Sequence, residues 1–185
     1  GMPMPLPFQY IQDRDLWTWK LEESRPYLAA HNLIPKTLED YYSFTVNVIE
    51  GDSLEARAAV IEQGHLAQVV MAQTHKETAK ETIRYLSILG YDNLPTVNCP
   101  SFFMSDIGSD IIQEAPDTPF VLMWCLSQDG LKVGLRSKSD YSKVDVSSIA
   151  TLINPKGGGH HCAAGAFIPI ADVPMNPVSK ILLGF

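Results

Sequence analysis

Apolar residues between about residues 13 and 90 recur at three- and four-residue intervals, which is the spacing typical of amphipathic helices. The longest such pattern follows Asp52 and Ser53, which are suited to the start of a helix. A further helical stretch is predicted to end at Gly90, a residue favoured just beyond the last helical turn. The apolar residues of this stretch are Ile83, Leu86 and Leu89.

Shorter helices are predicted ahead of this long pattern. Asp15 is expected to cap a short helix, Ser24 and Pro26 to begin a second, and Thr37 to cap a third. The first ten residues are rich in proline and predict an extended arm.

The pattern changes after Gly90, and short apolar or alternating runs beyond it predict strands. These runs cover residues 94–99, 120–126, 131–135 and 166–170, and helical spacing covers residues 101–115 and 145–153. The turn at Gln128, Asp129 and Gly130 predicts a hairpin. The sequence therefore predicts an α/β protein, with a helical linker-like region over residues 1–92 and a mixed β-sheet domain with flanking helices over residues 93–185.

Composition limits the classes of protein to consider. The formal net charge of −7 argues against a non-specific binder of long nucleic acid. The three cysteines lack a Cys-x-x-Cys spacing, which argues against a zinc ribbon and a disulfide framework and favours a cytoplasmic protein with reduced thiols. No run of roughly 18 apolar residues predicts a membrane span, and residues 2–7 lack the features of a signal peptide.

Two segments have the composition of a phosphate-binding site. Gly157, Gly158 and Gly159 precede His160 and His161, and a glycine bend of this kind is expected to offer backbone N–H groups to an anion. Arg136, Ser137 and Lys138 end the alternating strand, and the planar guanidinium of arginine suits bidentate phosphate contacts. The alternatives are a plain loop with a capping histidine, a surface ion pair for Arg136 and a structural imidazole for His161.

These segments and their order resemble the DHH-associated domain of the DHH phosphoesterase family. The resemblance covers about residues 93–171, and the matching stretches are Val97–Pro100, Ser105–Gly108, Gly134–Ser137, Asp145–Ala150 and Gly157–Gly165. The segment from Tyr10 to Trp17 is similar to the one that closes the family's catalytic domain.

The resemblance implies binding of a phosphorylated nucleotide or a short single-stranded oligonucleotide. Members of the family cleave phosphate esters or anhydrides with two divalent metals, usually manganese, held in an N-terminal domain. By resemblance, Arg136 would hold a phosphate, and Gly158, Gly159 and His160 would line the same pocket. The acidic residue of the last metal motif would fall at Asp13 or Asp15, for which a helix cap or a solvated acidic face is the alternative.

The chain departs from the family because it contains no Asp-His-His and no Asp-x-Asp-Gly sequence. We therefore expect the isolated chain to bind phosphate without hydrolysing it efficiently. A first alternative is a manganese-dependent phosphoesterase or exonuclease whose catalytic half lies on a separate chain. A second is an assembly protein that forms a homodimer.

Overall fold

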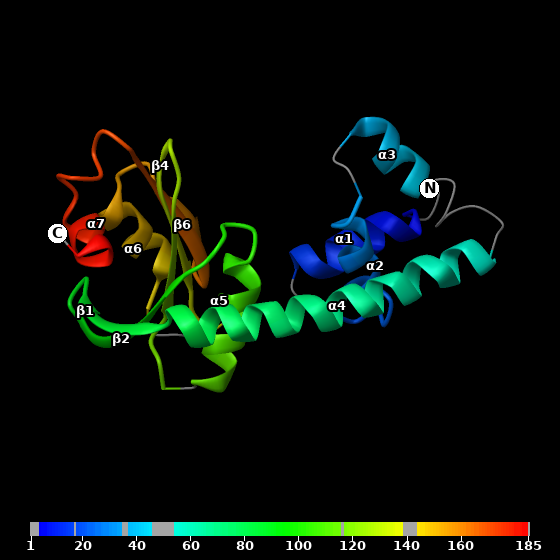
Figure 1. Cartoon of the computed structure of the whole chain (residues 1–185), viewed down its shortest axis with the longest axis horizontal. Coiled ribbons are helices and arrows are strands. Elements are labelled where there is room, and N and C mark those ends of the chain that lie inside the picture. Colours follow the sequence, from blue (N-terminus) through cyan, green and yellow to red (C-terminus); the bar gives the residue numbers. More distant parts are fainter. Residues whose placement is uncertain are drawn as a thin grey trace. The chain divides into compact units, whose positions relative to one another are not determined.

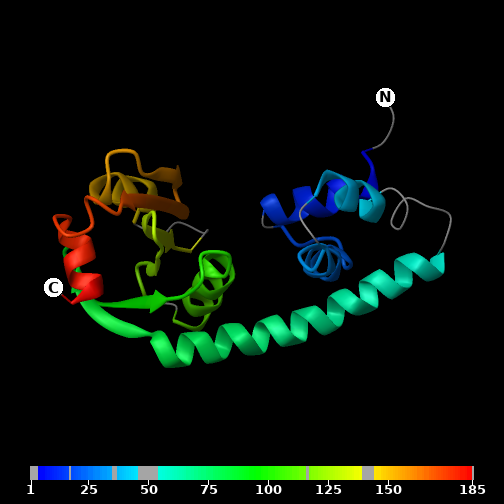
Figure 2. The same cartoon turned by 45° about the horizontal axis from the view of Figure 1, so that its top comes forward.

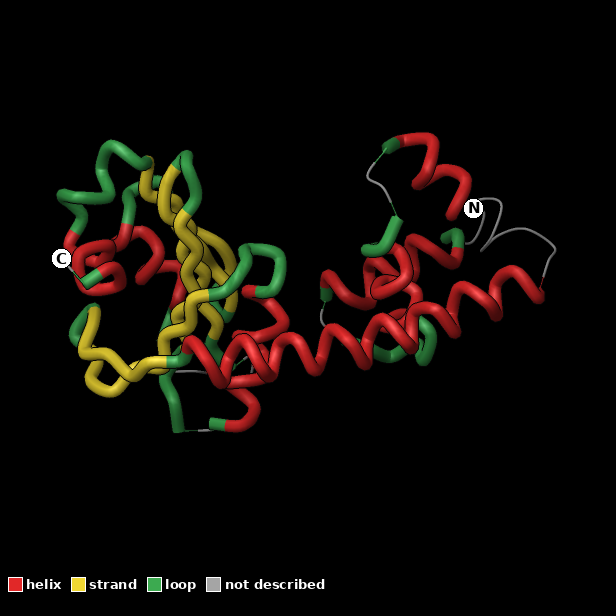
Figure 3. Tube along the Cα trace, viewed as in Figure 1, coloured by secondary structure: helices red, strands yellow, loops and turns green. Residues whose placement is uncertain are grey.

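The computed structural model describes residues 4–16, 18–34, 37–45, 54–115, 117–138 and 144–184. The chain forms two compact units, which divide between Thr74 and His75 (Figure 1). The first unit is helical, and the second contains a six-stranded mixed sheet with flanking helices (Figure 3). The predicted α/β class is therefore confirmed. Within the described ranges, no helix has both the length and the apolar run that crossing a membrane requires.

The first unit consists of α1 (Leu6–Asp15), α2 (Ser24–His31), α3 (Leu38–Tyr42) and the N-terminal part of α4 (Leu54–Thr82). Pro26 lies in the first turn of α2, as predicted. Thr37 caps α3, also as predicted, because its hydroxyl accepts a 3.2 Å hydrogen bond from the Asp40 N–H. The core of this unit is formed by Tyr10, Tyr27, Leu28, Ala30, Phe44, Val60 and Ile61.

The helix α1 corrects two expectations. The extended arm predicted for the first ten residues is wrong from Leu6 onward, and Asp15 ends a helix instead of capping the start of one. Pro7 lies in the first turn of α1, where its missing N–H removes no intrahelical hydrogen bond. The predicted start of α4 at Asp52 and Ser53 lies outside the described residues.

The helices α2 and α4 approach closely because Gly64 has no side chain. A Cβ atom on Gly64 would lie 1.9 Å from the Pro26 carbonyl oxygen. On the same unit, the Tyr10 hydroxyl donates a 2.5 Å hydrogen bond to Glu23, and Arg57 of α4 pairs with the same carboxylate. Burial and the bond to Glu23 raise the pKa of Tyr10 to about 12, so the phenol keeps its proton at neutral pH.

The sheet of the second unit has the strand order β1-β2-β3-β4-β6-β5. Its strands are β1 (Arg84–Ile88), β2 (Tyr91–Asn98), β3 (Val121–Leu126), β4 (Gly130–Arg136), β5 (Gly158–His160) and β6 (Ala163–Pro169). Neighbouring strands pair antiparallel except β2 and β3, which run parallel and are joined through α5 (Met104–Glu114).

Helices cover both faces of this sheet (Figure 2). Alternation along β3 separates two apolar clusters, because successive side chains of a strand point to opposite faces. Leu122 packs with α6 (Val146–Ile153) and α7 (Pro177–Leu183), whereas Val121 and Met123 pack with α5. The face that carries α5 is the one on which the candidate site lies.

Three elements of the second unit differ from those that the sequence predicts. The helix predicted over Ile83, Leu86 and Leu89 is wrong, because α4 ends at Thr82 and β1 pairs with β2. Leu89 and Gly90 both have positive φ, 56° and 81°, so Gly90 belongs to a hairpin turn and does not terminate a helix. The helix predicted over residues 101–115 begins at Met104, and the last long strand begins at Ala163, earlier than predicted.

We predict that Gly64→Ala destabilises the first unit. Alanine in a helix interior normally stabilises by about 1 kcal/mol relative to glycine. Here the added methyl group would overlap the Pro26 carbonyl, so the free energy of unfolding should fall by about 2 kcal/mol or more. Denaturant unfolding checks this, with the exposed neighbour Gln63→Ala as the control. Equal or greater stability of Gly64→Ala would contradict the packing described here.

Candidate phosphate-binding pocket

A pocket of about 270 Å³ lies on the α5 face of the sheet, between the start of α5 and strands β3 to β6. Six of its eleven lining residues are glycine or alanine, so much of the wall is backbone. A ligand can approach peptide groups closely where no side chain intervenes. The lining residues are Met104, Ser105, Met123, Gly134, Leu135, Arg136, Gly158, Gly159, Ala163, Ala164 and Gly165.

Arg136 is the one charged side chain among the described residues that line this pocket. It is the last residue of β4 and pairs in register with Val121 of β3 and Ala163 of β6. Burial lowers the pKa of the half-buried guanidinium, whereas the charges of Cys162 and Asp106 act in the opposite direction. Arginine nevertheless stays protonated in proteins, so the pocket contains a permanent, partly desolvated cation.

The start of α5 supplies a second feature suited to an anion. Met104 and Ser105 form the first turn of α5 and line the pocket. The N–H groups of a first helical turn have no acceptor within the helix, and the helix dipole makes this end positive. Arg136 and this end of α5 are both suited to an anion, whereas Asp106 in the same first turn adds a negative charge.

The glycine segment does not form the predicted bend, because Gly158, Gly159 and His160 make up the edge strand β5. Gly159 has φ of 149°, a conformation that favours glycine. A Cβ atom there would lie 2.5 Å from the Ala163 carbonyl oxygen, whereas a Cβ on Gly158 would meet nothing within 4 Å. An edge strand turns alternate N–H groups away from its partner, so backbone donors remain at this wall.

The structure brings together three of the eight residues predicted to bind substrate. Arg136, Gly158 and Gly159 line the pocket, but the other five do not. Ser137 is buried and its N–H donates to the Cys162 carbonyl at 3.0 Å, and Lys138 follows it without lining the pocket. Gly157 packs against α6, since a Cβ there would lie 2.3 Å from the Ala150 carbonyl oxygen.

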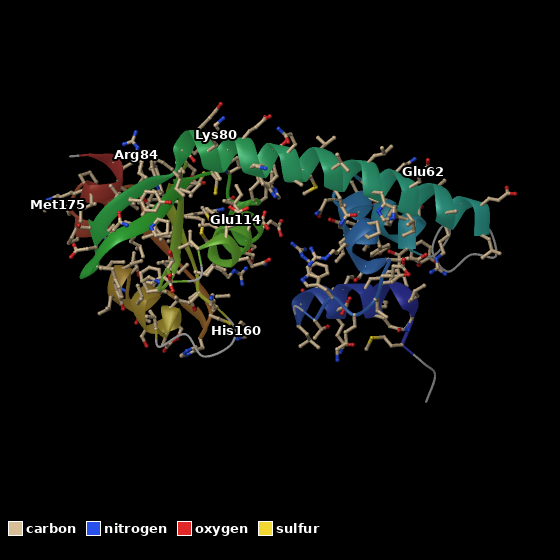
Figure 4. All side chains as sticks on the ribbon, turned by 90° about the horizontal axis from the view of Figure 1, so that it is seen from below. Glu62, Lys80, Arg84, Glu114, His160 and Met175 are labelled. Carbon is tan, nitrogen blue, oxygen red and sulfur yellow. The ribbon has the colours of Figure 1, made fainter. Side chains whose placement is uncertain are left out.

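The two histidines lie beyond this glycine wall. The side chain of His160 is exposed at the end of β5 (Figure 4). His161 approaches Asp145, with 3.6 Å between its Nδ1 and the Asp145 Oδ1, and its carbonyl accepts a 2.9 Å hydrogen bond from the Val146 N–H. His161 thus joins the connection between β5 and β6 to the start of α6.

Asp145 caps α6. Its carboxylate accepts hydrogen bonds from the Ser147 N–H at 3.0 Å and from the Ser147 and Ser148 hydroxyls at 2.6 and 2.7 Å. These bonds lower the pKa of Asp145 to about 2, and the bond from the Ser147 hydroxyl has the largest effect. The carboxylate is therefore ionised at neutral pH.

Sequence reasoning missed several lining residues. Gly134, Ser105 and Gly165 stand inside the segments that carry the family resemblance, and that is a signal from which they could have been found. Met104 and Met123 offer no such signal, because an apolar residue in a helix or buried strand is ordinarily part of the core. Only the folded arrangement shows that both side chains face the pocket.

The chain was compared with family models, curated proteins and solved structures. No family model matches the chain. An uncharacterized protein of Acanthamoeba polyphaga mimivirus is 28% identical over 168 residues, which are 88% of this chain and 37% of that protein. The chain therefore spans little more than a third of the length of this curated relative.

Solved structures reveal the fold. The pGpG-specific phosphodiesterase PggH of Vibrio cholerae aligns with 98% of this chain and 67% of its own, with a TM-score of 0.53 and 13% identity. The DHH domain of a member of the s1p family of ribosomal proteins aligns with 87% of this chain and 42% of its own, with a TM-score of 0.53 and 11% identity. The chain has the DHH-family fold. RecJ of Thermus thermophilus with Mg²⁺ has a TM-score of 0.50 and 15% identity, over 85% of this chain and 23% of its own.

The predicted metal residues of this DHH-family fold do not come together as a metal site. Asp13 is 6% exposed, and its oxygens accept hydrogen bonds from Thr18, Lys20, Leu21 and Ser24 at distances from 2.5 to 3.1 Å. Burial alone would raise the pKa of Asp13, but the bonds from Ser24, Thr18 and the two backbone N–H groups lower it well below its usual value. Asp13 thus organises the chain between α1 and α2.

Asp15 is exposed at the end of α1. No group of three or more His, Cys, Asp or Glu side chains in the described part of the chain is arranged to hold a metal ion. The described residues therefore do not fit the two-manganese site that the fold family implies.

We predict that alanine at the two neighbouring glycines of β5 has different effects. Gly158→Ala should change the free energy of unfolding by less than about 0.5 kcal/mol, because its Cβ has open space. Gly159→Ala should lower it by about 1–3 kcal/mol, because it combines an unfavourable φ with a backbone clash. Denaturant unfolding of both variants measures the difference. Equal stability would contradict the described conformation of β5.

A second prediction concerns Asp145 and pH. The pKa of its carboxyl is lowered from 3.8 to about 2 on folding, so the ionised group stabilises the fold above pH 4 and this contribution is lost as the pH falls toward 2. Asp145→Ala should therefore lower the melting temperature at pH 7. The difference from the wild type should shrink between about pH 4 and 2. Thermal melting at several pH values measures it, and a difference that persists unchanged at pH 2 would refute this role for the carboxylate.

Proposed function

We propose that this chain binds a phosphate group of a nucleotide or a short single-stranded oligonucleotide in the pocket beside Arg136. The observation that carries the proposal is a half-buried guanidinium, the one charged side chain among the described lining residues, in a wall made largely of glycine and alanine. Such a wall allows a phosphate to contact backbone N–H groups and the guanidinium together.

The charge of the chain supports a small ligand over a long polyanion. The formal net charge is −7, so attraction to an anion depends on the local field of Arg136 and the start of α5. A long nucleic acid would also meet the acidic remainder of the surface, whereas a ligand with one or a few phosphates need not. The fold is shared with PggH, which is described as a pGpG-specific phosphodiesterase, and this agrees with a nucleotide ligand.

Hydrolysis is not part of this proposal for the isolated chain. The Asp13 carboxylate is engaged in hydrogen bonds, and the described residues offer no arrangement of three metal-binding side chains. The structures of similar fold are longer than this chain, as the alignments to 67% and 42% of two of them show. For a role in cleavage, the proposed source of further ligating residues is a separate catalytic chain.

We predict that Arg136→Ala weakens binding of the 5′-phosphorylated dinucleotide pApA at least tenfold, which is about 1.4 kcal/mol. The reason is the loss of the charged partner of the terminal phosphate. Isothermal titration calorimetry measures the affinity, with ApA, which lacks the 5′-phosphate, as the matched ligand. Wild-type protein should bind ApA more weakly than pApA, and Arg136→Ala should reduce this preference.

Two further variants make the test specific. Arg84→Ala removes an exposed arginine on β1, at the far end of the strand order, and should leave the affinity unchanged. Gly158→Leu should fill the pocket from the open side of β5 and weaken binding without removing charge. Full binding by Arg136→Ala, or equal affinity of the wild type for pApA and ApA, would refute the proposal.

A further inference from the structure

The sheet face that carries the pocket continues along β4 and β6 beyond it. In register, Arg136 lies opposite Ala163, Gly134 opposite Gly165, and Lys132 opposite Phe167. Alternate residues of a strand share a face, so these three pairs follow one another on the same side of the sheet. Successive pairs are about 7 Å apart along the strands, which places the Lys132 and Phe167 pair about 13 Å from the Arg136 backbone.

Phe167 presents an aromatic ring on this open part of the sheet. Its side chain is 41% exposed, although it belongs to a central antiparallel pair of strands. The tip of the ring lies against Gly130, where a Cβ atom would come within 2.8 Å of the Phe167 Cζ. The neighbouring strand therefore supports the ring, while a substantial part of the side chain remains accessible to a planar ligand.

Lys132 adds a positive charge next to this ring. The side chain is exposed and lies directly opposite Phe167 on the neighbouring strand, where paired Cβ atoms are about 5 Å apart. The ion pairs found among the described residues involve Arg57 and His161, not Lys132. Its charge is thus available to a ligand that already occupies the pocket.

We propose that Lys132 and Phe167 form a second subsite, which binds the next nucleotide of an oligonucleotide whose terminal phosphate lies at Arg136. The base stacks on Phe167, and the following phosphate pairs with Lys132. Aromatic rings and cations on an open sheet face are a common means of binding single-stranded nucleic acid, because every base has a face that can stack. This inference rests on the proposed function and specifies its ligand as at least a dinucleotide.

The experiment compares the affinities of AMP and pApA for the full chain by calorimetry. Wild-type protein should bind pApA about tenfold or more tightly than AMP. Phe167→Leu, which keeps an apolar side chain but removes the ring, and Lys132→Gln should each reduce this preference at least threefold. Both variants should bind AMP as the wild type does. Lys132→Gln should also reduce the dependence of log affinity on log salt by about 0.7.

Matched variants elsewhere on the second unit control for non-specific effects. Tyr85→Leu removes an exposed aromatic ring from β1, and Lys180→Gln removes an exposed lysine from α7. Neither should change the preference for pApA. Thermal melting of each variant tests whether the fold is retained, and the AMP affinity gives a second check that the pocket is intact.

The outcomes separate this inference from the proposed function. If Arg136→Ala weakens both ligands but the preference for pApA survives Phe167→Leu and Lys132→Gln, the second subsite is overturned and the pocket stands. An equal loss of preference in Tyr85→Leu would also overturn it. If the wild type binds neither ligand, or if Arg136→Ala weakens neither, the proposed function fails and the second subsite fails with it.

Discussion

The close contact between α5 and the sheet is the constraint on which the pocket depends. A Cβ atom on Gly108 would lie 2.7 Å from the Met123 sulfur and 3.2 Å from the Arg136 Cβ, so a larger residue would displace the end of the Met123 side chain and crowd Arg136. The same approach brings Met104 over Gly134, where a Cβ atom would lie 3.3 Å from the Met104 sulfur. The first turn of α5 therefore lines the same pocket as Arg136.

This packing also determines the electrostatics of the site. A guanidinium in open water would attract phosphate weakly, because solvent and salt screen it. Half-burial between β3, β4 and β6 removes part of that screening, and the nearby charge of Asp106 acts on the same guanidinium. A local positive charge can attract an anion even on an acidic chain, because the local field can oppose the net charge.

The sequence predicted the parts of the fold in which local pattern and tertiary packing agree. β3 is a continuous apolar run, β4 alternates clearly after a turn signal, and helical spacing marks α6, so these elements appear as expected. The stretch from Ile83 to Leu89 is different, because its spacing suits either a helix or a strand. Pairing with β2 decides in favour of the strand, and pairing between distant segments is not visible in a local pattern.

The candidate site shows the same limit. Arg136, Gly158 and Gly159 could be selected because arginine and glycine have distinctive chemistry, whereas Met104 and Met123 could not be separated from ordinary core residues. Strand pairing also sets the backbone conformation of Gly158 and Gly159. Both belong to the extended edge strand β5, which pairs with β6, and not to a bend. Residue type thus indicated the ligand class, but only the register of β4, β5 and β6 shows which side chains share a face.

Asp13 shows why a resemblance in sequence does not transfer a chemical role by itself. A carboxylate binds a divalent metal through oxygen lone pairs that are free to coordinate, and a two-metal site needs several such groups together. The Asp13 oxygens instead accept hydrogen bonds from two hydroxyls and two backbone N–H groups, which connect α1 to the start of α2. An aspartate can hold a metal in a catalytic domain. Here the aspartate accepts hydrogen bonds from the segment that connects α1 to α2.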